Sequence, residues 1–234
     1  MGRAFPAEPK GFVILDLRMN REFSNRAARI VEHPLTRRAV AKQRTRERLV
    51  DSARRLFTER GYEAATVRDI AAAAGLSTGA VFASFTDKAE LFSEVLSADY
   101  RALRDDMEKL DRDGLPAREA LLSVLNLAYQ RHLDQLGLVQ ASMGFSWQGD
   151  PSAEARNRQG AKLILSLLGA ILIGGVERGE LSARLDIKLA SEMLWDAYLS
   201  NYRQAIFDDW DVAALMARLA SQLDLLLAGF SAAA

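Results

Sequence analysis

Apolar residues at helical spacing, interrupted by glycines, constrain what residues 45–100 can fold into. From Thr45 the apolar residues recur at intervals of three and four up to Gly61, which predicts one face of an α-helix. A second stripe ends at Gly75, and a third, shorter one ends near Asp87. Two short helices joined by a tight turn containing glycine form a helix-turn-helix unit. The pattern therefore predicts a small helical domain whose second short helix is slim enough to enter a major groove.

Polar residues stand where these helices are expected to begin. Thr66, three residues before Asp69, resembles a capping box; Ser77 or Thr78 can cap the third helix and Asp87 the fourth. The residues predicted to face inward from the third helix are Val81, Phe82 and Phe85.

Composition excludes several classes of site. The 234 residues contain no cysteine and two histidines, so disulfides, thiolate catalysis and cysteine-based zinc sites are excluded and no metal or cofactor is expected. Lys and Arg number 31 and Asp and Glu 31, but residues 1–46 hold eleven basic and four acidic groups, a local charge of +7. A segment with this charge is typical of one that binds a polyanion. Residues 1–36 are equally compatible with a solvated leader. Met19 is also compatible with being the first residue of the translated protein.

The chain is expected to be all-α, with three parts. We predict a basic N-terminal extension over 1–42, a three-helix helix-turn-helix DNA-binding domain over 43–104, and a second helical domain over 105–230. The uncharged run 163–176 is shorter than the roughly 18 residues that span a membrane, so it is predicted to be a buried helix of a cytoplasmic protein with no membrane partner.

One stretch of sequence resembles a known family. It contains Phe57-x-x-x-Gly61-Tyr62, Ala65-Thr66-Val67-Arg68-Asp69-Ile70-Ala71, Ala74-Gly75-Leu76-Ser77-x-Gly79, Phe82-x-x-Phe85 and Asp87-Lys88-x-x-Leu91. From Arg46 to Leu91 it is similar to the DNA-binding domain of the tetracycline-repressor (TetR) family. The resemblance implies a homodimeric transcriptional regulator, usually a repressor, with a ligand cavity in its C-terminal domain.

The predicted DNA contacts have physical reasons. Gly79 lets the backbone approach a phosphate, while Arg68 and Lys88 are placed to clamp phosphates beside the reading helix. Several of these positions are equally typical of helix caps or solvated surface. The full predicted set is Arg44, Arg46, Thr66, Arg68, Ser77, Thr78, Gly79, Phe82, Ala83, Ser84 and Lys88.

Two departures from the family pattern predict sparse direct reading of bases. The family commonly has Tyr where this chain has Phe82, and larger polar groups where it has Ala83 and Ser84. Phe82 cannot donate a hydroxyl hydrogen, and Ala83 offers only a methyl contact, for example to thymine. We expect the basic segment 37–46 to compensate along the DNA backbone or in the adjacent minor groove.

Further helices are predicted over 117–132, 138–147 and 153–178. Two more helices follow at the C-terminal end, with Asp186 and Asp211 as their predicted N-caps. Met143-x-Phe145-x-Trp147 is also compatible with an extended segment. The last two helices carry wide apolar stripes that predict a symmetric four-helix bundle between two copies, the alternative being that both stripes face the chain's own core. The residues predicted for this interface are Ala190, Met193, Leu194, Ala197, Leu215, Met216, Leu219, Leu223 and Leu226.

A dimer would place two reading helices about one duplex turn apart, so the expected partner is double-stranded DNA with a pseudo-palindromic operator. A hydrophobic or aromatic small-molecule effector is expected among the helices that lie between the DNA-binding domain and the C-terminal end. Large apolar side chains there end in a few polar groups, which is the usual chemistry of a small-molecule pocket. Taken singly, each candidate is more typical of a core residue than of a ligand contact. The candidates are Tyr129, His132, Met143, Phe145, Trp147, Trp195, Tyr198 and Tyr202.

Two other functions compete with a ligand-controlled regulator. One is a DNA-binding dimer without an effector. The other is a helical enzyme with a vestigial DNA-binding head; the sequence lacks cysteine, a Glu-x-x-His bundle spacing and a Gly-x-Ser-x-Gly motif, so we predict no enzyme.

Overall fold

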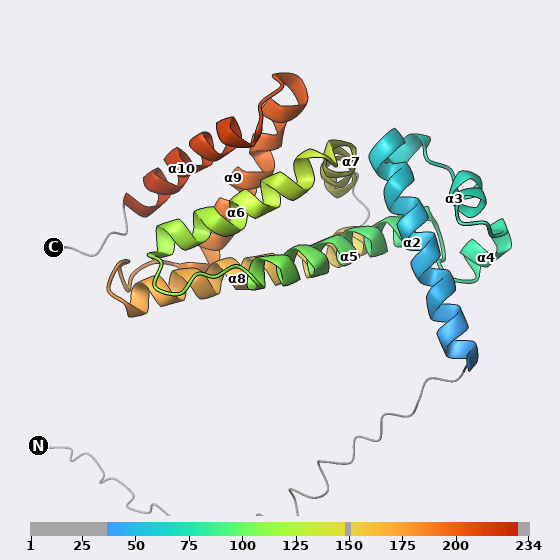
Figure 1. Ribbon diagram of the computed structural model, residues 1–234, viewed down its shortest axis with the longest axis horizontal. Coiled ribbons are helices and arrows are strands. Elements are labelled where there is room, and N and C mark those ends of the chain that lie inside the picture. Colours follow the sequence, from blue (N-terminus) through green and yellow to red (C-terminus); the bar gives the residue numbers. More distant parts are fainter. Residues whose placement is uncertain (1–36, 148–150, 229–234) are drawn as a thin grey trace, which may run out of the picture. The chain divides into compact units, whose positions relative to one another are not determined.

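The computed structural model describes residues 37–147 and 151–228. Its regular elements are α-helices, which confirms the all-α class (Figure 1). They are α2 (Arg37–Ala64), α3 (Val67–Ala73), α4 (Thr78–Phe82), α5 (Lys88–Glu108), α6 (Ala117–Leu133), α7 (Leu136–Trp147), α8 (Pro151–Glu177), α9 (Ile187–Phe207) and α10 (Val212–Ala228). Residues 1–42 and 43–234 form two separate units, and the packing described below is that of the second. Of the basic extension predicted over 1–42, residues 1–36 lie outside the described residues, and residues 37–42 are helical as the start of α2.

The predicted helix boundaries are set by local chemistry. Gly61, at φ 75°, interrupts α2 where the sequence predicts its end. The Thr66 side chain accepts from the Asp69 backbone N–H while the Asp69 carboxylate accepts from the Thr66 N–H, which confirms the capping box. Ser77 and Asp87 cap α4 and α5. The ambiguous segment 143–147 is helical, as part of α7.

The short helix α4 is held by two buried side chains. Val81 and Phe85 are 1% and 2% exposed, and they anchor α4 in the core shared with α2, α3 and α5. Phe82, predicted to face inward with them, is 58% exposed instead. A helix this short buries only one narrow face, and Phe82 follows Val81 by one position, which turns it about 100° away.

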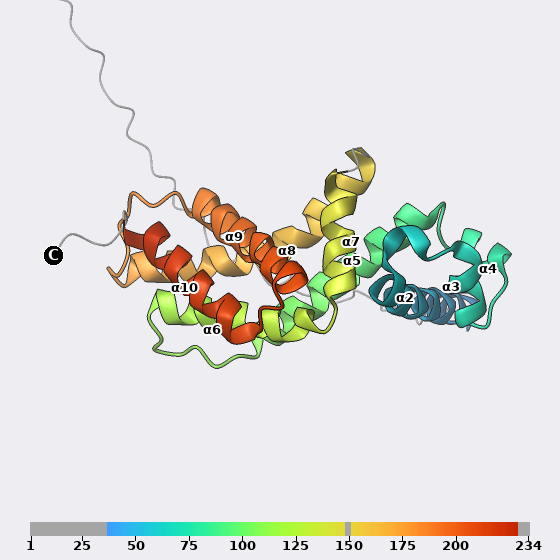
Figure 2. The ribbon, with the colours of Figure 1, turned by 90° about the horizontal axis from the view of Figure 1, so that it is seen from above.

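The remaining helices form a bundle in which α5 and α8 lie side by side, and α10 packs against α6 and α9 (Figures 1 and 2). Residues 154–177 of α8 are long and apolar enough to cross a membrane by length and composition alone. In the fold, Ile164, Leu168 and Leu172 of this helix are buried in the protein core, whereas Ile173 is 46% exposed, so the burial predicted for 163–176 holds for one face of the helix.

The stripes of α9 and α10 divide between the core and the surface. Five residues predicted to contact a second chain are buried inside the protomer instead: Ala190, Leu194, Leu215, Leu219 and Leu223. That part of the interface prediction is corrected, because α10 packs on α9 and α6, and these side chains of α9 and α10 are buried within the protomer. Met193 is 51% exposed, and Ala197, Met216 and Leu226 are half-buried.

The first turn of α7 lies directly against α2. A side chain at Gly137 would overlap the backbone carbonyl oxygen of Thr58, so the approach of the two helices requires glycine. Beside this contact, the ring of Phe92 from α5 meets Phe57 of α2 and Phe145 of α7 edge-on, with centroids 4.9 Å apart in each pair. The helix-turn-helix head and the C-terminal helices therefore share a tightly packed junction.

This junction predicts opposite effects for two glycines of the same helix. Gly137→Ala is expected to destabilise the protein by about 2 kcal/mol, because the added methyl must displace backbone. Gly144→Ala is the matched control: nothing lies within 4 Å of a Cβ there, so it is expected to leave stability unchanged or raise it by up to about 1 kcal/mol. Urea unfolding measures both, and equal effects would contradict the proposed contact.

Candidate DNA-binding surface and effector site

The outward face of α4 carries four small or apolar residues. Thr78 and Phe82 are one turn apart, as are Gly79 and Ala83, and all four are exposed. Helices α3 and α4 lie on the side of α2 away from the C-terminal helices (Figures 1 and 2). The second helix of the helix-turn-helix unit is therefore presented outward.

Arg46, predicted to contact DNA, is instead occupied beneath α4. Its guanidinium donates to the Ser84 carbonyl oxygen at 2.7 Å, pairs with Glu94 at 2.7 Å, and lies 4.1 Å from the centre of the Phe85 ring. These contacts tie the end of α4 to α2 and α5. We assign Arg46 to positioning α4 and no longer to a phosphate contact.

Lys88 is likewise occupied. Its ammonium group donates to the Tyr62 carbonyl oxygen at 2.9 Å and lies 4.2 Å from the centre of the Tyr62 ring. It satisfies backbone oxygen at the end of α2, a favourable place for a cation. The predicted role as a phosphate clamp is therefore replaced by a structural one.

Other predicted contacts remain at the surface. Arg44 and Arg68 are exposed, as are Thr66 and Ser77. The last two are helix caps, since each side-chain oxygen accepts a backbone N–H. Ser84 is half-buried, and its hydroxyl donates to the Ala80 carbonyl oxygen at 3.0 Å.

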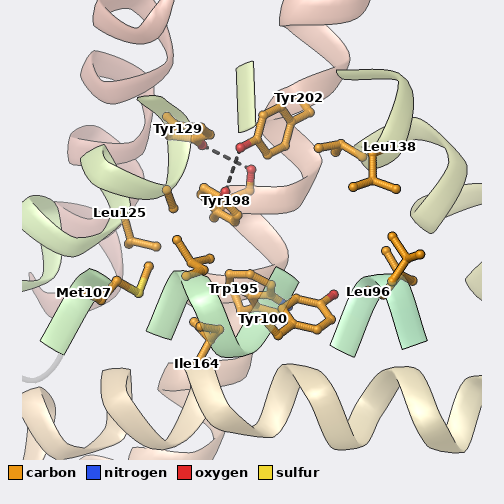
Figure 3. Packing of buried hydrophobic residues seen from close by; sticks show 14 of the residues in the cluster. Leu96, Tyr100, Met107, Leu125, Tyr129, Leu138, Ile164, Trp195, Tyr198 and Tyr202 are labelled. Carbon is orange, nitrogen blue, oxygen red and sulfur yellow. Dashed lines mark hydrogen bonds between the residues drawn. The ribbon is translucent and has the colours of Figure 1, made fainter. Parts of the chain in front are cut away.

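Five of the predicted effector residues gather in one buried cluster between α6 and α9. Figure 3 shows four of them, Tyr129, Trp195, Tyr198 and Tyr202. Trp195 stacks on Tyr198 with centroids 4.9 Å apart, and Tyr198 lies 4.6 Å from Tyr129. The hydroxyl of Tyr129 donates to the Tyr198 carbonyl oxygen at 3.1 Å. Tyr202 and His132 complete the group.

Phe145 lies elsewhere, at the junction with Phe92 and Tyr62 (4.9 and 5.2 Å). Met143 of α7 is half-buried against the core. Neither lines the cavity described below, and of Trp147 the backbone alone is described, at the end of α7.

A chain of hydrogen bonds leads from the aromatic cluster to the head. The Tyr198 and Tyr202 hydroxyls lie 2.6 Å apart, and the Tyr198 hydroxyl lies 2.9 Å from His132 Nδ1. His132 Nε2 lies 2.8 Å from Asp99 Oδ2, and Asp99 Oδ1 accepts from Arg54 at 2.6 Å. The carboxylate can only accept, so the imidazole donates through Nε2. Side chains of α2, α5, α6 and α9 thus meet in one network.

Charge and burial compete at Asp99, which is 5% exposed. Burial raises the pKa of this carboxyl, but the hydrogen bond and charge of His132 and the guanidinium of Arg54 outweigh it and lower the pKa from 3.8 to about 2. Burial also raises the pKa of the Tyr198 and Tyr202 hydroxyls well above the ordinary value. At neutral pH the network therefore holds a carboxylate and two neutral phenols.

Two hollows adjoin this network. A cavity of about 30 Å³ is lined by Asp99, His132 and Tyr202 together with apolar side chains of α5, α7 and α9. An open groove of about 1240 Å³ runs between α8 and α9. Tyr100, Trp195 and Leu199 line both hollows. These three residues therefore form the wall between the groove and the buried cavity.

Comparison with known proteins places the fold in a family. Residues 49–95 match the model of the bacterial regulatory proteins of the tetR family. The chain is 30% identical over 161 residues to the probable HTH-type transcriptional regulator ArpR of Pseudomonas putida, covering 64% of this chain and 74% of that protein. The chain belongs to the TetR family. The predicted function of a DNA-binding transcriptional regulator is thereby confirmed.

Two further TetR-family relatives cover similar lengths. The HTH-type transcriptional repressor KstR2 of Rhodococcus jostii is 28% identical over 161 residues, 64% of this chain and 74% of its own. The structure of Thermus thermophilus FadR, a TetR-family transcriptional repressor in complex with lauroyl-CoA, superposes with a TM-score of 0.64 at 25% identity, over 79% of this chain and 94% of that one.

The charged part of the site was not predicted from the sequence. Asp99, Arg54 and Arg131 were absent from every candidate set, although Arg131 lies 3.6 Å from Asp99. A signal was present: Asp99 is a carboxylate four residues from both Val95 and Leu103, in the buried stripe of α5. A charge at a core position requires partners, and that requirement points to a site.

The low pKa of Asp99 makes acid stability testable. Because the folded-state pKa lies below the unfolded one, the carboxylate stabilises the protein above about pH 4, and this contribution is lost as pH falls toward 2. Asp99→Asn is expected to lower the free energy of unfolding at pH 7 by about 2 kcal/mol. It is also expected to weaken the dependence of that free energy on pH between about pH 4 and 2. Exposed Asp105→Asn on the same helix is the control. Denaturant unfolding at each pH measures this free energy. If it falls equally steeply below about pH 4 in Asp99→Asn and in the unchanged protein, this account is contradicted.

Proposed function

We propose that the protein is a repressor that binds a pseudo-palindromic operator as a homodimer and releases it when an acyl thioester of coenzyme A binds the C-terminal helices. The observation that carries the DNA-binding part is the outward face of α4, anchored from behind by Val81 and Phe85. Both KstR2 and Thermus thermophilus FadR are named as repressors, which supports the direction of control.

The phosphate contacts are proposed for exposed groups only. Arg68 stands in the first turn of α3, and Arg44 belongs to the basic N-terminal half of α2. The helix N-termini at Thr66 and Ser77 offer backbone N–H groups next to them. The basic residues of 37–46 other than Arg46 are proposed to add sequence-independent affinity along the backbone.

Dimerisation is proposed through the apolar side chains that α9 and α10 leave uncovered. Leu189, Met193 and Phe207 of α9 are 53%, 51% and 71% exposed, and Leu225 of α10 is 79% exposed. Ala197, Met216 and Leu226 extend this surface. Large exposed apolar residues on two adjacent helices favour burial against a second copy, and a symmetric pair presents two α4 helices.

The operator prediction is tested by selecting bound duplexes from a random pool. An inverted repeat with half-site centres about one turn, roughly 34 Å, apart is expected. Arg68→Ala is expected to weaken binding to all duplexes alike and to reduce the salt dependence of binding by about one ion. Arg184→Ala, an exposed arginine in the turn before α9, is the control and should change neither. Enrichment of sites without symmetry would contradict the dimer, and no enrichment would contradict DNA recognition.

The ligand class is argued from the groove between α8 and α9. Its floor is apolar, with Leu165, Ile173 and Trp195, which suits a hydrocarbon chain. Its lining includes Lys162, which has no ion-pair partner among the described residues, and Asn157, whose buried Oδ1 has no hydrogen-bond partner among them. A long apolar chain with an amide-containing, anionic end matches all three features. The lauroyl-CoA complex of Thermus thermophilus FadR supports this class.

The small cavity beside the groove links the proposed ligand to DNA binding. A volume of about 30 Å³ holds about one water molecule, so an acyl chain can enter only if the Tyr100 and Trp195 wall moves. Asp99 lines this cavity and also accepts from Arg54 of the head. A ligand that opens the cavity therefore acts on a contact that positions the head, and shifts the population of DNA-competent dimers.

We expect lauroyl-CoA to raise the melting temperature and to release the operator, with coenzyme A alone and free laurate less effective. Lys162→Ala is expected to weaken lauroyl-CoA binding about fivefold while leaving laurate binding unchanged, because only the anionic end is lost. Lys109→Ala, an exposed lysine outside the groove, is the control. Stabilisation by charged metabolites without an acyl chain would contradict the ligand class. Operator binding that no acyl thioester alters would favour a DNA-binding dimer without an effector.

A further inference from the structure

The chemistry of the exposed face of α4 limits what it can recognise. Phe82, at 58% exposed, is the large apolar side chain that the helix-turn-helix unit leaves in solvent. Beside it on the same face lie Ala83, with a single methyl, and Gly79, with none. This face presents carbon where a hydrogen-bonding reader would present amides or guanidinium groups.

The hydroxyl groups near this face are mostly used within the protein. Ser84 Oγ donates to the Ala80 carbonyl oxygen, and Ser77 Oγ accepts from the Ala80 N–H. Thr66 Oγ1 donates to Asp69 at 2.7 Å and accepts from its N–H. Within the part of the chain that the structure describes, Thr78 is left as the exposed α4 hydroxyl with no side-chain hydrogen bond. Bidentate reading of guanine or adenine by α4 has no side chain to perform it.

We propose that α4 reads its half-site through the C5-methyl groups of thymine, which pack against Phe82 and Ala83 in the major groove. This inference rests on the proposed placement of α4 in that groove. The thymine methyl is the one apolar group that a natural base pair presents there, so it is the complement of an apolar reading face. Phe82 is the specificity-determining residue, because its ring supplies most of that face.

The length of the face sets the number of bases. From Thr78 to Phe82 the helix rises about 6 Å, close to two base-pair steps of about 3.4 Å each. Phe82 and its neighbour Ala83 can therefore meet methyls on two adjacent base pairs. The expected half-site contains two or three thymines within a short run, repeated in inverted orientation.

The test changes the DNA and leaves the protein intact. In the operator recovered by selection, each thymine is replaced in turn by deoxyuridine, which pairs identically and lacks only the methyl. At a contacted position the affinity is expected to fall about fourfold per methyl, and about fifteenfold when both half-sites are changed. At positions outside the reading face no change is expected. Where cytosine is introduced at a contacted position, 5-methylcytosine is expected to recover a similar factor.

A variant then assigns the methyl to its protein partner. With Phe82→Ala, which removes an exposed side chain and leaves the Val81 and Phe85 anchors in place, the thymine-to-uracil penalty should disappear at the position that Phe82 contacts. Arg68→Ala is the matched control: it should weaken both duplexes equally and leave their ratio unchanged.

The outcomes separate this inference from the proposed function. A selected operator that binds equally with thymine or uracil at every position overturns methyl reading while leaving DNA recognition intact. A penalty that persists unchanged in Phe82→Ala overturns the role of Phe82. If no duplex is enriched at all, the proposed function and the inference fall together.

Discussion

The buried carboxylate of Asp99 constrains much of the fold, because a charge in the core must be satisfied from several directions at once. Arg54 reaches it from α2, His132 and Arg131 reach it from α6, and Tyr198 of α9 completes the chain of contacts. Apolar packing alone would allow these helices to slide past one another, whereas hydrogen bonds of 2.6–2.9 Å fix their register. The head therefore reaches the C-terminal helices through a polar contact as well as through the aromatic junction at Phe92.

Most of the local structure follows from the sequence, because helix ends are decided by nearby residues. The caps at Thr66, Ser77, Asp87 and Asp186 and the break at Gly61 all lie where the pattern predicts them. A capping side chain bonds a backbone N–H two or three residues away, so its effect needs no knowledge of the tertiary fold.

What the sequence could not predict is which surface covers each stripe. Leu215, Leu219 and Leu223 form a stripe equally suited to the protomer core or to a second chain, and the fold places them in the core. Arg46 and Lys88 have the residue type and spacing of phosphate clamps, but each meets an acceptor distant in sequence, Ser84 and Glu94 for Arg46 and Tyr62 for Lys88. Phe82 resembles a core residue until the narrowness of α4 is known. Each error concerns a contact between segments far apart in the chain.

The small volume of the cavity beside Asp99 also bears on the size of the proposed ligand. Separating one partner from a buried, hydrogen-bonded ion pair such as Arg54 and Asp99 costs about 3–5 kcal/mol, and water entering the opened site reduces that cost. Each methylene that leaves water returns about 0.8 kcal/mol. About four to six buried methylenes therefore offset the opening of the network, before any contact of the anionic end is counted. For a short acyl chain, the free energy gained by burying methylenes only offsets the cost of opening the site. A chain of a dozen carbons gains more than this cost, and the difference can shift the protein away from the conformation that binds DNA.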